Sequence, residues 1–293
     1  MEIRIDEHAG YCFGVVKAIG AAEAQLSQSG SLYCLGDIVH NSAEVERLKC
    51  KGMKVIDHED LQRLPQGSRV LIRAHGEPPS TYRAASERGI ELIDATCPIV
   101  LALQERIRRG YNEMQAVGGQ IVLFGKPGHA EVIGLNGQCD GSAIIVSHPD
   151  DLDHIDFGRP IRLYSQTTKS RDEYRRLTAN IEARLPQGAD FVAFDTVCNR
   201  VANRAKELET FACSVDVLLF VAGANSSNGR YLYEYCRHVQ PHTYLIATAD
   251  ELQPGWFDGV SKVGISGATS TPRWLMEEVK SVLGNQYPPT THP

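Results

Sequence analysis

The sequence lacks several features that would define a simple class of protein. It contains no CxxC pair, which argues against a zinc ribbon or a thioredoxin-like site. No apolar run approaches the roughly 20 residues of a membrane span, and the first residues lack the apolar core of a secretory signal. We therefore expect a cytoplasmic protein that does not enter the membrane.

Positive charge is also scarce. Lysine and arginine number 30 against 36 aspartate and glutamate residues, which gives a net charge of -6 and a pI near 5.9. Nucleic acids and anionic membranes bind basic surfaces, so we expect neither as a partner. An acidic chain can still bind an anionic small molecule where a local pocket supplies hydrogen-bond donors.

What the chain does contain is ordinary globular composition, with 293 residues, 42% of them hydrophobic. This length is enough for two or three domains. Apolar runs alternate with helical periodicity, which is typical of α/β proteins with mainly parallel sheets. Strands are expected at 70–73, 121–124, 144–146, 217–221, 243–246 and 262–265. Helices are expected at 15–27, 80–88, 99–114, 171–184, 202–213, 229–238 and 272–282. Loop-rich linkers are expected at 147–160 and 185–189.

One local arrangement occurs three times. A strand-like run ends in a turn, a cysteine follows and a helix begins, at Cys12, Cys97 and Cys198. Each interval is about one small α/β unit long, which predicts three similar lobes. Each cysteine would then lie at the carboxyl end of a strand, where open sheets place their ligands. The start of a helix there favours the thiolate that binds metals.

Three thiolates are one fewer than the four that normally complete an iron–sulfur cluster or a structural zinc site. The open position would admit a substrate to the metal. Zinc on three cysteines is one alternative, although zinc carries no electrons, and simple burial of small residues is another. The other five cysteines are expected to be structural, because a reducing compartment disfavours disulfides: Cys34, Cys50, Cys139, Cys213 and Cys236.

Three histidines stand out as candidates for binding an anion. His40, His75 and His129 each follow a predicted strand end or lie close to one, in turn-like or Gly-rich segments. Imidazoles can donate to phosphate and can carry positive charge near neutral pH. The other seven histidines are expected to be ordinary polar residues. Near His129, Glu131 is a candidate for proton transfer, as is Thr167 in the segment SQTT.

A second set of anion donors follows the apolar run 217–221. Ser226, Ser227 and Asn228 lie in a turn before a predicted helix, and Ser270 lies in a similar turn before Pro272. Backbone N–H groups and hydroxyls can converge on an anion at such helix starts. The spacing matches neither a P-loop nor GxGxxG. Ordinary helix capping by Ser and Asn is the alternative.

Together these segments closely resemble the 4-hydroxy-3-methylbut-2-enyl diphosphate reductase family, also called LytB/IspH, over about residues 1–283. The segments that carry the resemblance are GYCFGVVKAI, DIVHN, AHG, DATCP, GHAEVIG, SQTT, the Cys198 segment, NSSN and GATSTP. The resemblance implies an α/β fold of three similar lobes in a pseudo-threefold trefoil around a central iron–sulfur cavity. The first lobe would comprise an N-terminal strand, 1–13, and residues 14–96. The second would span 97–193 and the third 194–285, followed by a tail, 286–293.

The resemblance also implies the chemistry. A [4Fe–4S] cluster, with one iron not ligated by cysteine, would bind Cys12, Cys97 and Cys198. Glu131, Thr167 and His129 would be catalytic, with Glu131 delivering protons as the substrate hydroxyl leaves as water. The diphosphate would be held by His40, His75, His129, Ser226, Ser227, Asn228 and Ser270. The products would be isopentenyl and dimethylallyl diphosphate, the isoprene precursors of the methylerythritol phosphate pathway. A ferredoxin or flavodoxin would donate the electrons.

The chain departs from the family pattern beside these residues. The family usually reads TCPxVxKxH after the second cysteine, whereas Ala102 and Gln104 stand here in place of the Lys and the His. Phe13, Arg73 and Gly229 are further departures. Such neighbours tune a metal centre and the fit of its substrate. A paralogue that reduces a related allylic alcohol or diphosphate is therefore the first alternative, and a zinc- or cysteine-dependent hydrolase of phosphorylated metabolites is the second.

Overall fold

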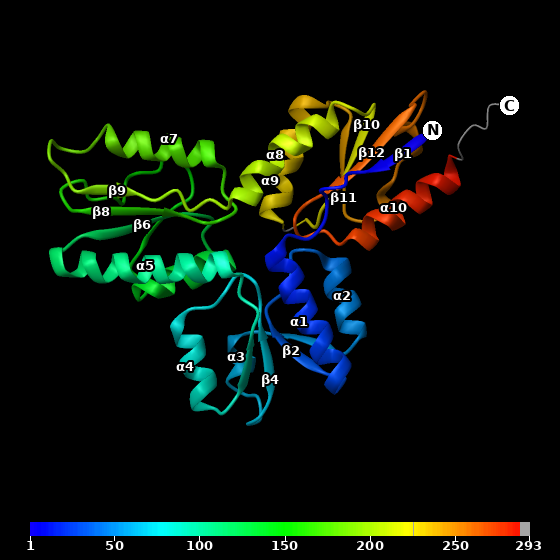
Figure 1. The fold of residues 1–293 in the computed structure, drawn as a ribbon. Coiled ribbons are helices and arrows are strands. Elements are labelled where there is room, and N and C mark those ends of the chain that lie inside the picture. Colours follow the sequence, from blue (N-terminus) through cyan, green and yellow to red (C-terminus); the bar gives the residue numbers. More distant parts are fainter. Residues whose placement is uncertain (225, 288–293) are drawn as a thin grey trace. The chain divides into compact units, whose positions relative to one another are not determined.

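The computed structural model describes residues 1–224 and 226–287, with the side chain of Ser227 excepted. Three four-stranded parallel sheets, with helices between the strands, form an α/β fold (Figure 1). The expected tail lies outside the described residues from position 288 onward, and its first residue, Gln286, ends the last helix, α10 (Arg273–Gln286).

The first sheet has the order β3-β2-β4-β5. Its strands are β2 (Leu32–Leu35), β3 (Met53–Ile56), β4 (Arg69–Ile72) and β5 (Glu91–Asp94). The helices in this part of the chain are α1 (Phe13–Ser29), α2 (Ser42–Cys50), α3 (His58–Leu61) and α4 (Pro79–Glu87). Central strand β4 is buried over Val70, Leu71 and Ile72, as expected for a parallel strand with both faces covered.

The second sheet repeats this order as β7-β6-β8-β9. Its strands are β6 (Gln120–Phe124), β7 (Ile144–Val146), β8 (Ile161–Ser165) and β9 (Phe191–Ala193). The helices of this part are α5 (Pro98–Val117), α6 (Ala130–Asn136), the 3₁₀ helix η1 (Gly137–Cys139) and α7 (Arg171–Glu182). The expected linkers 147–160 and 185–189 join elements within this sheet and separate no domains.

The third sheet has the order β1-β12-β10-β11 and draws on both ends of the chain. Its strands are β1 (Glu2–Ile5), β10 (Val217–Val221), β11 (Thr243–Ile246) and β12 (Lys262–Gly267). The helices are α8 (Asn199–Ala212), α9 (Ser227–Val239), the 3₁₀ helices η2 (Ala249–Glu251) and η3 (Pro254–Trp256), and α10 (Arg273–Gln286). β1 pairs with β12, Ile3 opposite Val263. The N-terminal strand therefore belongs to this sheet. The expectation that it belongs to the first lobe is wrong, because its partner strand, β12, lies near the other end of the chain.

All three sheets follow one plan. The first strand in each repeat is central, the second lies at one edge, the third is central and the fourth closes the other edge. In the third sheet, β1 supplies that fourth strand. The chain order changes direction between the two central strands, which is the point where open parallel sheets bind ligands at their carboxyl ends. The three-lobed α/β prediction is thus confirmed at the level of the sheets.

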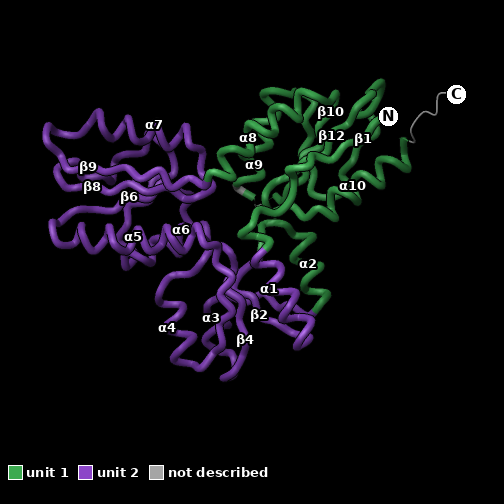
Figure 2. Tube along the Cα trace, in the orientation of Figure 1, with its two compact units in different colours: residues 1–16, 39–51, 199–293 green, residues 17–38, 52–198 purple. Residues whose placement is uncertain are grey.

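The described chain divides into two compact units (Figure 2). One comprises Met1–Val16, Val39–Lys51 and Asn199–Pro293 and contains the third sheet. The other comprises Lys17–Ile38 and Gly52–Cys198 and contains the first two sheets. Among the described helices, none has the length and apolar character needed to cross a membrane.

Candidate active site

The three predicted ligand cysteines share one backbone setting. In each case the cysteine amide donates to the carbonyl of the second residue after the third strand of its sheet. The bonds are Cys12 to Thr269 (3.1 Å), Cys97 to Ala74 (3.0 Å) and Cys198 to Thr167 (2.9 Å). A helix begins at the next residue, as α1, α5 or α8. The repeated arrangement inferred from the sequence is therefore present in all three sheets.

Exposure separates these three cysteines from the others. Cys12, Cys97 and Cys198 are half-buried. Cys34, Cys139 and Cys236 are buried, and burial raises the pKa of each thiol to about 12, as befits inert core residues. Cys50 and Cys213 are exposed, so the burial seen at the other three is not shared by these two.

The unit that contains Cys12 also gathers hydroxyl and amide groups beside it. The Ser226 and Ser270 hydroxyls lie 3.3 Å apart, and the Asn228 side chain donates to the Thr269 hydroxyl (2.7 Å). The Oδ1 atom of Asn228 is buried without a partner in the described part of the chain. A buried amide of this kind can satisfy a polar ligand. Because the Thr269 carbonyl also binds the Cys12 amide, these donors adjoin the cysteine.

Ser226 also has the local role that the sequence left open. Its hydroxyl accepts from the amide of Gly229 (3.0 Å) and caps α9. Capping and anion binding are compatible, because the remaining N–H groups of the helix start stay available. At Gly229 a Cβ would lie 2.7 Å from that of Ala222, so the space at this position suits glycine. The side chain of Ser227 lies outside the described residues.

His40 belongs to the same unit, where its backbone lies close to that of Gly223. A Cβ at Gly223 would lie only 2.3 Å from the His40 carbonyl oxygen, so only glycine permits this approach. The next residue, Asn41, caps α2 by accepting from the Glu44 amide (3.1 Å). The Glu44 carboxylate in turn accepts from the indole of Trp274 (2.8 Å), which ties α2 to α10. The half-buried His40 is thereby held beside the loop that follows β10.

In the other unit, His75 and His129 lie together. Their rings pack edge to face with centroids 5.4 Å apart. His129 caps α6, where its Nδ1 accepts from the Glu131 amide (3.2 Å). With Nδ1 as the acceptor, the proton of the neutral ring lies on Nε2, which is then the atom able to donate to a ligand.

Glu131 is the most perturbed acid of the site. It is 2% exposed, and burial raises its pKa from 4.5 to about 7, although two hydrogen bonds from Thr167 oppose the shift. The Thr167 amide donates to Oε1 (2.7 Å) and its hydroxyl to Oε2 (2.8 Å). The Thr167 carbonyl meanwhile accepts from the Cys198 amide. A carboxyl that holds its proton near neutral pH is suited to general acid catalysis.

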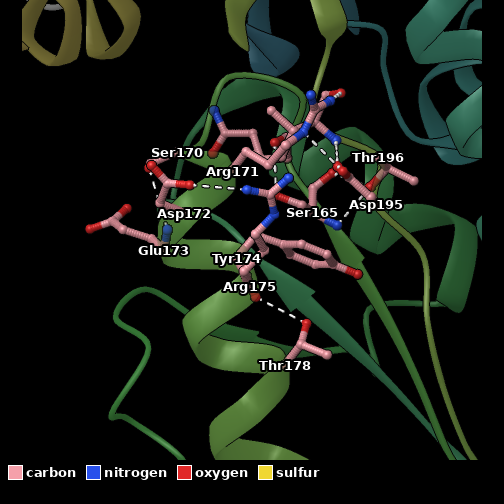
Figure 3. A network of polar contacts seen from close by, with 12 residues as sticks. Ser165, Ser170, Arg171, Asp172, Glu173, Tyr174, Arg175, Thr178, Asp195 and Thr196 are labelled. Carbon is pink, nitrogen blue, oxygen red and sulfur yellow. Dashed lines mark hydrogen bonds and ion pairs between the residues drawn. The ribbon is translucent and has the colours of Figure 1, made fainter.

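A polar network holds the segment before Cys198 (Figure 3). Arg171, the first residue of α7, pairs with the carboxylate of Asp195 (2.9 Å) and donates to the carbonyl of Val197 (3.2 Å). The Thr196 hydroxyl bridges the amide and the carbonyl of Ser165, each at 2.7 Å. The network therefore joins residues 195–197, which directly precede Cys198, to Ser165 at the end of β8, two residues before Thr167.

The candidates follow the topology of the sheets closely. Three of them, His40, His129 and Ser226, stand five residues after the first central strands β2, β6 and β10. Three more stand two or three residues after the other central strands, namely His75 after β4, Thr167 after β8 and Ser270 after β12. Each pair of loops borders the ligand-binding point of its sheet. Sequence reasoning missed Thr269 and Arg171. Thr269 could have been found from its position beside Ser270 in the segment GATSTP, whereas no motif indicated Arg171.

Comparisons with known proteins agree with this geometry. A family model described as LytB protein matches residues 3–284. The 4-hydroxy-3-methylbut-2-enyl diphosphate reductase of Parabacteroides distasonis is 52% identical, over 95% of this chain and 96% of the relative. The reductase of the same name from Bacteroides fragilis is 50% identical, over 98% of each chain.

Solved structures extend the likeness to the fold. A structure of (E)-4-hydroxy-3-methyl-but-2-enyl diphosphate reductase, described as the terminal enzyme of the non-mevalonate pathway, is 37% identical with a TM-score of 0.72. The matched region covers 97% of this chain and 100% of that chain. The E-1-hydroxy-2-methyl-but-2-enyl-4-diphosphate reductase of Plasmodium falciparum has a TM-score of 0.85 at 26% identity, over 98% of this chain and 89% of that one. The chain belongs to the LytB family, which confirms the resemblance found in its motifs.

Proposed function

We propose that this protein is a reductase that removes the hydroxyl group of 4-hydroxy-3-methylbut-2-enyl diphosphate and forms isopentenyl and dimethylallyl diphosphate. The observation that carries the proposal is the threefold setting of the cysteines, each hydrogen-bonded to a loop that bears or adjoins a candidate substrate residue. The names of the relatives supply the substrate, and one solved relative is described as the terminal enzyme of the non-mevalonate pathway. We therefore propose that the step belongs to isoprene precursor synthesis by the methylerythritol phosphate pathway.

The donor set fits an iron–sulfur cluster. Thiolates are the ligands that such clusters require, and Cys12, Cys97 and Cys198 are half-buried residues at helix starts, where backbone dipoles favour thiolate charge. We assign these three cysteines as ligands of a [4Fe–4S] cluster with one iron not ligated by cysteine. When bound, the cluster supplies electrons and an iron able to accept the substrate oxygen.

The diphosphate is assigned to neutral donors and not to a basic surface. Ser226, Asn228 and Ser270 offer hydroxyl and amide groups at the start of α9 and after β12. Ser227 is assigned with them from its motif alone. The three histidines, His40, His75 and His129, complete the set. Imidazole and hydroxyl donors, with the N-terminus of a helix, can hold phosphate oxygens in a protein of net negative charge.

Proton delivery is assigned to Glu131. Its raised pKa keeps a proton available near pH 7, and the hydroxyl of Thr167 holds the carboxyl in one orientation. His129 is assigned with it, because its Nδ1 accepts from the Glu131 amide and its Nε2 can donate to the substrate. Loss of the hydroxyl as water consumes one proton, and protonation of the carbon skeleton consumes a second.

The reaction requires two electrons, which we assign to a ferredoxin- or flavodoxin-like donor. We expect the protein to act in the cytoplasm, without nucleic-acid or membrane partners, in keeping with its net charge of -6.

The test is anaerobic purification followed by metal analysis and an assay with the C4-hydroxylated diphosphate and a reduced dye. We expect iron and acid-labile sulfide in the protein and oxidation of the dye that depends on substrate. Glu131→Gln should retain the cluster and lose at least about a hundredfold in turnover. Zinc in place of iron, or full activity in air without a reductant, would contradict the proposal and favour a hydrolase.

A further inference from the structure

Two of the assigned ligand cysteines follow a peptide group that accepts a hydrogen bond from a cationic side chain. The Lys17 ammonium on α1 donates to the Thr96 carbonyl (3.0 Å), directly before Cys97. The Arg171 guanidinium donates to the Val197 carbonyl (3.2 Å), directly before Cys198. All these residues lie within one compact unit. Neither cation belongs to the donor set assigned above.

The two cations differ in their net effect on the local charge. Arg171 is paired with Asp195, which offsets most of its positive charge. For Lys17, no carboxylate among the residues that the structure describes forms an ion pair with the ammonium. Lys17 is also half-buried, where water screens a charge less than at an exposed position. The Asp94 carboxylate accepts from the Thr96 amide (2.9 Å) and adds a negative charge to the same segment. A group bound at Cys97 would therefore experience the charge of Lys17 together with that of Asp94.

Lys17 also helps to orient the cysteine. The carbonyl of Thr96 and the amide of Cys97 belong to one planar peptide group. The carbonyl is held by Lys17, while the amide donates to Ala74 (3.0 Å). Because both ends of the peptide group are bound, the direction in which the Cys97 side chain leaves the backbone is restricted. Contacts of this kind around a ligand are known to tune a metal centre.

We propose that Lys17 is a positioning residue for Cys97 whose positive charge raises the reduction potential of the metal centre. The inference rests on the proposed function. Reduction adds negative charge to a cluster that thiolates already make negative, and a nearby fixed cation stabilises the reduced state more than the oxidised state. Loss of the charge should therefore make the centre harder to reduce.

Three substitutions separate the charge from the hydrogen bond. Lys17→Gln retains a donor and loses the charge, Lys17→Met loses both, and Lys17→Arg retains both. The anaerobic holoprotein of each variant is titrated against redox dyes, with the reduced centre followed by electron paramagnetic resonance. We expect Gln and Met to shift the one-electron equilibrium about tenfold toward the oxidised form, which is about 59 mV, and Arg to match the wild type.

Lys169→Met is the matched control. Lys169 likewise donates to a backbone carbonyl, that of Ser147 (3.1 Å), but Glu173 offsets its charge (3.4 Å). We expect no shift in this variant. Iron and sulfide content and thermal unfolding are measured for the wild type and all four variants, so that a loss of stability is not mistaken for a change of potential.

The outcomes distinguish the inference from the proposed function. A wild-type potential in Lys17→Gln would overturn the role of the charge, as would an equal shift in Lys169→Met. If both neutral variants lose the cluster and Lys17→Arg keeps it, the charge is needed for cluster binding, and the inference that it sets the potential of the bound centre is overturned. Loss of the cluster from Lys17→Arg as well would make Lys17 merely structural. A wild-type protein without iron and sulfide would contradict the proposed function itself.

Discussion

At the scale of single residues, the chemistry of the site depends on how far burial changes one carboxyl group. Glu131 is enclosed by protein, and desolvation raises its pKa to about 7 against the opposing hydrogen bonds of Thr167. Desolvation wins because two hydrogen bonds replace only part of the hydration of a carboxylate. An acid with its pKa raised this far keeps a protonated fraction at neutral pH that an ordinary glutamate does not.

The pH dependence of kcat/KM should report this group. Because Glu131 must be protonated to act as an acid, activity should fall as pH rises through about 7. The hydroxyl of Thr167 lowers the pKa, so Thr167→Val should move this alkaline limb upward by about one pH unit. The measurement is the pH profile of each variant under anaerobic conditions.

Thr178→Val is the control for that profile. Its hydroxyl donates to the Tyr174 carbonyl within α7 (3.0 Å), and among the described residues no hydrogen bond joins it to Glu131. Its limb should coincide with that of the wild type. A limb that moves downward in Thr167→Val, or stays in place, would show that Glu131 is not the titrating acid.

At the scale of elements, three segments of the site meet at Gly76. This glycine follows His75 and has a φ of +72°, and a Cβ there would lie 2.6 Å from the side chain of Gln104 on α5. A Cβ at Gly134 on α6 would lie 3.1 Å from the same Gln104 atom. Gln104 thus stands where the family usually has histidine and packs between the His75 loop and α6. The helix of Cys97, the His75 loop and the helix of Glu131 are positioned together.

Gly76→Ala should therefore be more costly than an ordinary replacement of glycine. It adds a close contact with Gln104 and with Thr96 (3.0 Å) to the strain of a left-handed backbone, for a total of about 2–4 kcal/mol. Gly118→Ala shares a left-handed backbone, φ +67°, but has nothing within 4 Å, and should cost about 1–2 kcal/mol. Chemical unfolding of both variants gives the comparison, and equal losses would rule out the packing argument.

At the scale of the whole molecule, the two ends of the chain share one sheet. β1 pairs with β12, and just after β1 the carboxylate of Asp6 is buried against Arg204 of α8. Ser266 bonds to both, at 2.9 Å from Asp6 and 2.8 Å from Arg204. This network joins the segment that leads to Cys12 to the helix that begins after Cys198.

Arg204→Leu would leave the Asp6 carboxylate buried without its cation. Such a loss typically costs about 3–5 kcal/mol, and it should also lower the iron content of the protein. The exposed pair of Arg69 and Glu91 (3.0 Å) provides the control, since Arg69→Leu should cost at most about 1 kcal/mol. Unfolding in urea under anaerobic conditions measures both, and a similar cost for the two would contradict the assignment of Asp6 and Arg204 as a structural pair.

Local pattern was enough to predict much of the fold. Expected strands such as 121–124 and 217–221 and helices such as 99–114 agree with the structure, because apolar periodicity over several residues reflects burial directly. The short edge strands β3 and β7 and the short helix α6 carry weaker patterns, and of these only β7 was predicted. The cysteine loops were predicted from their repeated setting, and the structure shows the same backbone bond at each.

The sequence by itself determined the family, the three-lobed α/β class and the residues proposed for the site, because motifs and their spacing are local properties of the chain. Only the tertiary structure decided that β1 joins the third sheet, that Lys17 contacts the peptide group before Cys97, and that Glu131 is desolvated by its surroundings. The physical reason is that pairing, contact and desolvation depend on residues far apart in the chain, which the order of neighbours does not specify.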